Sequence, residues 1–187
     1  MNAMQLVAIL LVGLIAIPAS AEPPAAVATP AAPASTTAKP PAAKPAPVRM
    51  GCGIMTLDTR YDPARLLICD RNHAPKGRLL HYALDGNFLE EVATGLGMPT
   101  SASIQGDYVS VPDLHGRLVI LDKCNTIMAV LGHNPDPAQG KNYNIPQDKW
   151  IEGVFSGTHG SAWDAEGNLY VQDWNVAGRI MKLVRVR

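Results

Sequence analysis

The sequence has no excess of charge of either sign, since its 187 residues include 16 Lys and Arg and 16 Asp and Glu. Residues 49–187, the part able to fold, are also near neutral, with 14 basic and 15 acidic residues. A protein that binds nucleic acid normally carries a clear basic excess. We therefore expect no nucleic-acid partner.

Several motifs of common enzyme classes are missing. The chain has no C-x-x-C or C-x-x-C-H motif, no glycine-rich phosphate loop and no serine nucleophile elbow, which removes several enzyme classes. It has three cysteines, Cys52, Cys69 and Cys124. An odd number leaves at least one thiol unpaired within a monomer, and an intermolecular bridge stays open.

The first five residues lack Lys and Arg, yet the N-terminus still resembles an export signal. Leu6–Ile17 is an apolar run, and Ala19-Ser20-Ala21 follows it. This pattern predicts a signal peptide over residues 1–21, cleaved before Glu22, in a run too short to span a membrane. We expect a periplasmic or secreted protein without a transmembrane domain after cleavage. A buried N-terminal helix is the alternative.

Residues 22–48 have little besides Ala, Pro, Thr and Lys, and they hold eight of the 16 prolines. Proline fixes φ and removes backbone donors, so this stretch cannot form a helix core or a strand ladder. It is predicted to be a disordered linker, extended at about 3.1 Å per residue over roughly 80 Å. Spacing is its expected role.

Residues 49–187 lack sustained helical periodicity and instead contain three copies of one unit. Each copy has a β-rich run that ends on an aspartate and is followed by a Gly-Arg pair. The Gly-Arg pairs start 39 and 62 residues apart, and we interpret the polar stretch 133–152 as a loop inserted between copies. The aspartates are Asp70, Asp113 and Asp173, and the arginines are Arg78, Arg117 and Arg179.

Each copy is predicted to be a meander of short strands. The first copy, about residues 51–95, has strands at 53–57, 65–69, 78–84 and 88–93, with a hairpin signal at Asp85-Gly86. The second, about 98–132, has strands at 101–105, 107–111, 117–121 and 126–131. The third, about 157–187, has strands at 160–163, 168–172 and 179–186. Units of about 40 residues with four strands suit an all-β propeller.

Two stretches carry a family resemblance: RLLICDRNHAPKGRLLHYALDGNFLEEV and THGSAWDAEGNLYVQDWNVAGRIMKLVR. They resemble the NHL-type repeats of six-bladed propellers, and they are similar to bacterial secreted members of the peptidyl-α-hydroxyglycine amidating-lyase type. The resemblance covers about residues 51–187. Because this architecture hosts unrelated functions, it implies the fold more strongly than the activity.

The resemblance implies more blades than the chain contains. A six-bladed ring needs about twice this material, and the third copy is expected to lack its outer strand. An open half-ring exposes strand edges and apolar faces between blades. Three explanations follow: two chains complete a ring, a partner chain supplies the other half, or the chain is a truncated, non-functional fragment.

The resemblance also indicates one possible metal site. His159 occupies the place of a channel-lining histidine, and Cys52 occupies the matching place in the first copy. Imidazole and thiolate are good zinc ligands, but a site needs three or four ligands. A divalent metal, Zn or Ca, would therefore need further ligands from elsewhere. The alternative is a histidine that hydrogen-bonds water.

The recurring aspartates and arginines are interpreted as architectural, because a short carboxylate before a turn can accept backbone N–H bonds. We expect the arginines to make contacts between blades, and the three tryptophans to pack in the core. His73 and His115 are assigned to turns. His81, within a strand, and His133 have no neighbour at ligand spacing.

The leading hypothesis is therefore an exported interaction module that associates with a second copy or a partner chain. A metal-dependent lyase or hydrolase of the amidating-lyase type is the alternative. Catalytic residues are not assigned from the sequence.

Overall fold

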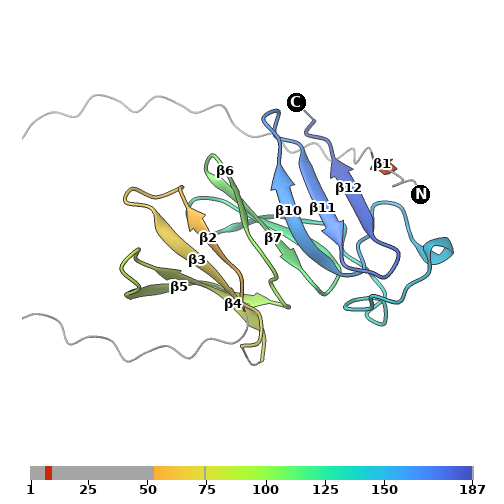
Figure 1. Cartoon of the computed structure of the whole chain (residues 1–187), viewed down its shortest axis with the longest axis horizontal. Helices are drawn as coiled ribbons and strands as arrows, with labels where there is room; N and C mark the ends of the chain where they lie inside the picture. The colour runs from red at the N-terminus through yellow and green to blue at the C-terminus, as the bar shows by residue number, and fades with distance from the viewer. Residues whose placement is uncertain (1–6, 10–52, 74, 187) are drawn as a thin grey trace, which may run out of the picture.

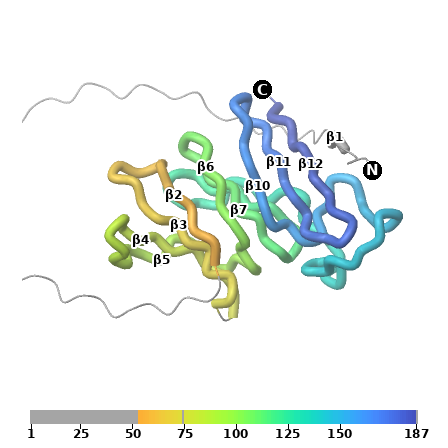
Figure 2. Tube along the Cα trace, viewed as in Figure 1, coloured from red at the N-terminus to blue at the C-terminus, as the bar shows by residue number. Residues whose placement is uncertain are grey.

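The computed structural model describes residues 7–9, 53–73 and 75–186, and this part of the chain is all-β. It forms three sheets that follow one another along the molecule in sequence order (Figures 1 and 2). The prediction of an all-β fold built of three antiparallel units is confirmed. No helix in the described ranges is long and apolar enough to cross a membrane.

Two of the three sheets have four antiparallel strands each, in sequence order. The first sheet contains β2 (Met55–Asp58), β3 (Arg65–Asp70), β4 (Gly77–Tyr82) and β5 (Phe88–Leu96). The second contains β6 (Ser103–Gln105), β7 (Tyr108–Asp113), β8 (Arg117–Leu121) and β9 (Ile127–Leu131).

The third sheet contains three antiparallel strands from the C-terminal repeat: β10 (Thr158–Trp163), β11 (Leu169–Asp173) and β12 (Arg179–Leu183). Each of the eleven strands predicted from the sequence overlaps one of β2–β12. Their ends differ by up to three residues.

The outer edge of the third sheet differs from the prediction that this copy lacks its fourth strand. A short strand, β1 (Val7–Ile9), pairs there in parallel with β12, with Val7 opposite Met181 and Ile9 opposite Leu183 (Figure 1). Proline cannot donate to a ladder, so the proline-rich linker is a poor source of this strand. The apolar run before the linker supplies it instead. The rest of the predicted signal peptide and the whole predicted linker lie outside the described residues.

Glycines in the left-handed region close two of the hairpins. Gly86, with φ of 85°, turns the chain between β4 and β5, and Gly167, with φ of 82°, does so between β10 and β11. Such φ values are strained for residues that have a Cβ. The Asp85-Gly86 hairpin is thus confirmed.

The connection between β9 and β10 contains one short helical turn, η1 (Gln147–Lys149), and no strand. Its two ends are anchored to each other, since Asn134 Nδ2 donates to the Phe155 carbonyl over 2.8 Å. Phe155 is buried in the core between the second and third sheets.

Side chains alternate between the two faces of each sheet, and the sheets pack face to face in sequence order. We call the face toward the preceding sheet the N-side face and the face toward the following sheet the C-side face. One core joins Leu67, Cys69 and Leu79 of the first sheet to Val109, Val111, Val119 and Leu121 of the second. The other joins Leu118 and Ile120 of the second sheet to Leu169, Val171 and Met181 of the third.

Candidate functional site

The three repeat aspartates end β3, β7 and β11, and each lies directly opposite the arginine of its own repeat. All three aspartates are fully buried. Arg78 Nε lies 2.9 Å from Asp70 Oδ2, Arg117 Nε lies 2.7 Å from Asp113 Oδ2, and Arg179 pairs with Asp173. The arginines were expected to join one repeat to the next, but these ion pairs form within one sheet.

Asp113 shows what such a carboxylate does. Its oxygens accept hydrogen bonds from the backbone N–H groups of Gly97 and Met98, each over 2.8 Å, and of His115 over 3.1 Å. Burial alone would raise the pKa of Asp113, but the N–H groups and the Arg117 guanidinium outweigh burial and hold this pKa below its usual range. The carboxylate therefore anchors the segment that leads into β6.

Asp173 anchors the start of the third sheet in the same way. The Ser156 N–H donates to Asp173 Oδ2 over 3.1 Å, and the Gly157 N–H donates to Asp173 Oδ1 over 3.1 Å. Arg179 pairs with this carboxylate and also donates a hydrogen bond to the Val154 carbonyl, in the inserted connection, over 2.6 Å. Asp113 and Asp173 thus hold neighbouring chain segments together by accepting hydrogen bonds from backbone N–H groups.

His159 lies at the start of β10, where the second and third sheets meet. Its carbonyl accepts hydrogen bonds from Thr100 Oγ1 over 2.8 Å and from Ser101 Oγ over 3.0 Å. Its ring lies 5.5 Å from the ring of Trp174. Burial, together with the positive charge of Arg71, lowers the pKa of His159, which favours the neutral imidazole able to bind a metal.

A metal site at His159 needs further ligands, and the described residues do not supply them as a group. Within the described ranges, no three His, Cys, Asp or Glu side chains gather in a group that could hold a metal ion. Cys52, the other predicted ligand, lies outside the described residues.

The three tryptophans have different surroundings. Trp163 belongs to the core between the second and third sheets, and its Nε1 donates to the Ser103 carbonyl over 3.1 Å. Trp150 is covered by the Arg179 guanidinium, 4.9 Å from the ring centroid. Trp174 is half exposed and contacts Tyr143 and His159, so core packing does not describe it.

A buried polar cluster on the first sheet was missed in the sequence. Asp58, Arg60 and His81 are all buried there. Arg60 Nη2 lies 2.7 Å from Asp58 Oδ2, and His81 Nε2 lies 2.9 Å from the same oxygen. Burial favours the neutral acid, but hydrogen bonds from Arg60 and His81 outweigh it and hold the pKa of Asp58 well below its usual range.

This cluster joins the first sheet to the turn between β8 and β9 of the second. Arg60 Nη1 donates to the Asp122 carbonyl over 2.6 Å, and Arg60 Nη2 donates to Asn125 Oδ1 over 3.0 Å. Tyr61 Oη adds a bond of 2.8 Å to the Lys123 carbonyl. One signal was available in the sequence: strand alternation puts His81 on the same face as Leu79, so it needed a buried partner. The identity of that partner depends on the fold.

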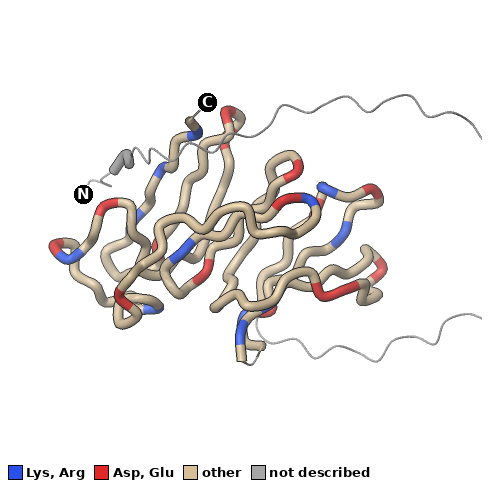
Figure 3. Tube along the Cα trace, turned by 180° about the vertical axis from the view of Figure 1, so that it is seen from behind, with Lys and Arg blue, Asp and Glu red and all other residues tan. Residues whose placement is uncertain are grey.

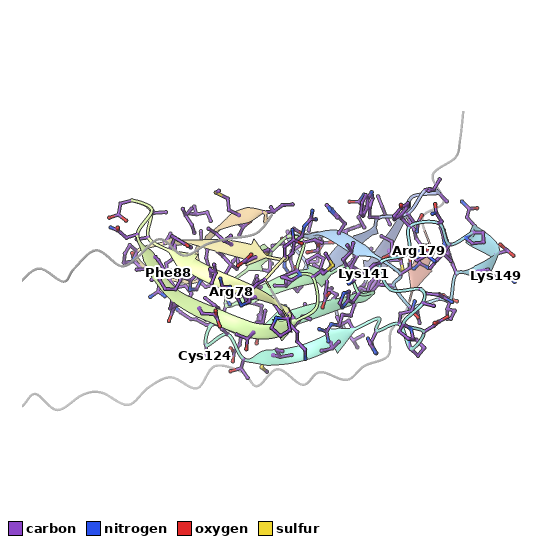
Figure 4. The ribbon with its side chains drawn as sticks, turned by 90° about the horizontal axis from the view of Figure 1, so that it is seen from below. Arg78, Phe88, Cys124, Lys141, Lys149 and Arg179 are labelled. Atoms are coloured by element: carbon purple, nitrogen blue, oxygen red, sulfur yellow. The ribbon has the colours of Figure 1, made fainter. Side chains whose placement is uncertain are left out.

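The N-side face of the first sheet is apolar and has no neighbouring sheet among the described residues. Ile68, Leu80 and Tyr82 form its centre and are each 9% exposed or less, and Leu66 and Phe88 pack against them. At its margin on β2, Met55 is 63% exposed and Leu57 is 51% exposed. Phe88 lies at the end of the molecule far from Arg179 of the third sheet (Figure 4).

The opposite end of the stack is the C-side face of the third sheet, which is mixed in character. Strand register and alternation place Tyr170, Gln172, Ile180 and Lys182 on it. Lys182 Nζ lies 5.1 Å from the Tyr170 ring centroid and 3.8 Å from Asp164 Oδ2. Figure 3 shows the charged residues of both signs in short, separate segments along the chain.

No protein-family model matches the chain, and no curated protein matches it.

Proposed function

We propose that the chain is an exported, NHL-type propeller segment of three blades that acts as an interaction module. Its binding surface is the N-side face of the first sheet, which receives another blade and so continues the ring. The observation that carries this proposal is the equivalence of that face to two faces that are already covered within the chain.

When the three repeats are aligned on their aspartates, each residue of this face has a counterpart in the other two sheets. Ile68 of the first sheet corresponds to Val111 and Val171, and Leu80 corresponds to Val119 and Met181. All four counterparts are buried against the preceding sheet. The uncovered face therefore has the residue types and positions that bind a neighbouring sheet elsewhere in this molecule.

At the margin of the face, Leu57 also corresponds to residues that are covered in the other two sheets. It pairs with Leu66, as Ile104 pairs with Val109 and as Trp163 pairs with Leu169. Ile104 and Trp163 both pack into a core shared with the preceding sheet, whereas Leu57 is half exposed. Full burial of a Leu or Met side chain contributes about 1.5–3 kcal/mol, so covering this face favours association.

Methionine oxidation tests the proposal, because two exposed methionines differ in their place. Met55 belongs to the uncovered face, while Met128, 54% exposed, lies on β9 of the central sheet. The purified full chain is treated briefly with hydrogen peroxide at low and high protein concentration, and each site is quantified by mass spectrometry.

We expect oxidation of Met55 to slow relative to Met128 as the concentration rises, because association covers Met55. A constant ratio of the two rates across the concentration series would contradict the proposed function.

A further inference from the structure

We infer that the blade seated on the uncovered face is the third sheet of a second copy of this chain. Two copies then join head to tail and close a ring of six sheets through two identical junctions. This inference rests on the proposed function and adds the identity of the partner and the second contact surface.

Two junctions between sheets lie inside the chain. Each joins the C-side face of one sheet to the N-side face of the next. The stack of three sheets therefore ends in two unlike faces: an N-side face on the first sheet and a C-side face on the third. Joining these faces repeats a packing that the chain already uses twice.

The C-side faces correspond by position. Ile180 of the third sheet aligns with Leu79 and Leu118, which are both fully buried under the following sheet. Tyr170 aligns with Leu67 and Ser110, which are buried in the same way. Ile180 and Tyr170 are thus expected to pack on the N-side face of the first sheet, whose exposed margin is formed by Met55 and Leu57.

Lys182 does not prevent this contact. It aligns with His81 and Ile120, which are buried on their own C-side faces. Its ammonium group already has Asp164 and the Tyr170 ring as neighbours, so its charge is partly compensated within its own sheet. A lysine can cover apolar surface with its methylene groups and keep its charge at the edge.

Symmetry determines the number of copies. A head-to-tail contact gives a closed ring when its rotation closes and an open filament when it does not. Propellers close with four to eight blades, and two copies of three sheets give six. Each copy then uses both of its end faces, and none is left for a third copy.

A back-to-back dimer is the competing arrangement, in which two first sheets meet through their apolar faces. It uses only the N-side face and leaves the third sheet of each copy uncovered. Variants on the third sheet therefore distinguish the two arrangements.

The test measures the mass of the purified full chain by size-exclusion chromatography with light scattering. Leu57→Glu places a charge on the N-side face of the first sheet, and Ile180→Glu places one on the C-side face of the third. Met128→Glu is the matched control, because Met128 is similarly exposed but lies on the central sheet. Circular dichroism checks that each variant keeps its strands.

We expect the wild-type chain and Met128→Glu to elute with the mass of two chains. Leu57→Glu and Ile180→Glu should each weaken association at least about tenfold, because each buries an unpaired charge. An equimolar mixture of these two variants should recover two-chain species, because one of its two junctions then contains only wild-type residues. Recovery on mixing also shows that both variants are folded.

The possible failures are distinguishable. If Ile180→Glu stays a dimer while Leu57→Glu becomes monomeric, the head-to-tail inference is overturned but the proposed binding face stands. If the wild-type chain is monomeric and Met55 shows no protection at any concentration, the proposed function and this inference both fail.

Discussion

Asp58 Oδ2 lies 2.9 Å from His81 Nε2, and neither side chain is exposed to solvent. The two residues stand on β2 and β4, with β3 between them, so the contact spans three strands of the first sheet. Arg60 binds the same carboxylate and donates a second hydrogen bond to the Asp122 carbonyl, in a turn of the second sheet. Asp58 thus joins strands of its own sheet and, through Arg60, contributes to the junction with the second sheet.

Replacing Arg60 with methionine should destabilise the protein by about 3–5 kcal/mol, because it leaves the buried Asp58 carboxylate with less compensation. The turn at Asp122 also loses its donor. Urea unfolding followed by circular dichroism measures the loss. As a control, Lys123→Met removes an exposed ion pair with Asp107 at 3.8 Å and should cost less than about 1 kcal/mol. Equal losses in the two variants would show that the Arg60 cluster adds no special stability.

Asp113→Asn should destabilise the folded chain at neutral pH by about 3 kcal/mol, because the carboxylate is buried and pairs with Arg117. The folded pKa of Asp113 lies below its unfolded value. Its contribution is therefore present above the unfolded pKa of about 3.9 and is lost as pH falls through the folded pKa.

The difference in stability between wild type and Asp113→Asn should accordingly be largest near neutral pH and shrink below about pH 4. Thermal unfolding of both proteins between pH 3 and pH 7 measures it. A difference that does not change with pH would mean that the charge of Asp113 contributes nothing to stability.

The two described cysteines should differ strongly in alkylation. Cys69 is buried, and burial raises the pKa of its thiol to about 12, whereas Cys124 is exposed. Because the thiolate is the reactive form, iodoacetamide at pH 8 should modify Cys124 in the native protein and Cys69 only after unfolding. Peptide mapping by mass spectrometry identifies each site. Rapid native modification of Cys69 would indicate that the core between the first two sheets opens readily.

Export should remove β1 from the third sheet. The predicted cleavage before Glu22 eliminates Val7–Ile9, which pair with Met181–Leu183. Mass spectrometry of protein recovered from the periplasm should therefore find Glu22 at the N-terminus. Amide exchange of β12 should be faster in this form than in the full chain, because one edge of β12 loses its partner. A periplasmic protein that retains residues 1–21 would contradict the predicted cleavage.

Local patterns were sufficient for the strands. Alternation of apolar residues, together with turn signals such as Asp85-Gly86, predicted each of β2–β12 because both effects act within a few residues. The outer strand β1 was missed because it pairs with β12 at a separation of more than 170 residues. No local pattern in Val7–Ile9 indicates that partner.

The polar contacts likewise divide into those that the local sequence predicts and those that depend on the fold. The position of Asp113 before a turn was enough to predict that it accepts backbone N–H bonds, and the bond from His115 is local in this way. Its other donors, Gly97 and Met98, are 16 and 15 residues away and depend on the fold. The cluster of Asp58, Arg60 and His81 was missed because its members meet across strands, and its outer contact lies in another repeat.

The sequence by itself determined the class of the fold, the three repeats and the place of each buried aspartate, because strand alternation and turn chemistry are local. Only the tertiary structure decided which faces of the sheets are covered, because burial depends on which sheet packs on which. It thereby separated Leu57, half exposed, from its counterparts Ile104 and Trp163, which have similar local sequence roles but pack against a preceding sheet. That difference in neighbours distinguishes the proposed binding surface from the core.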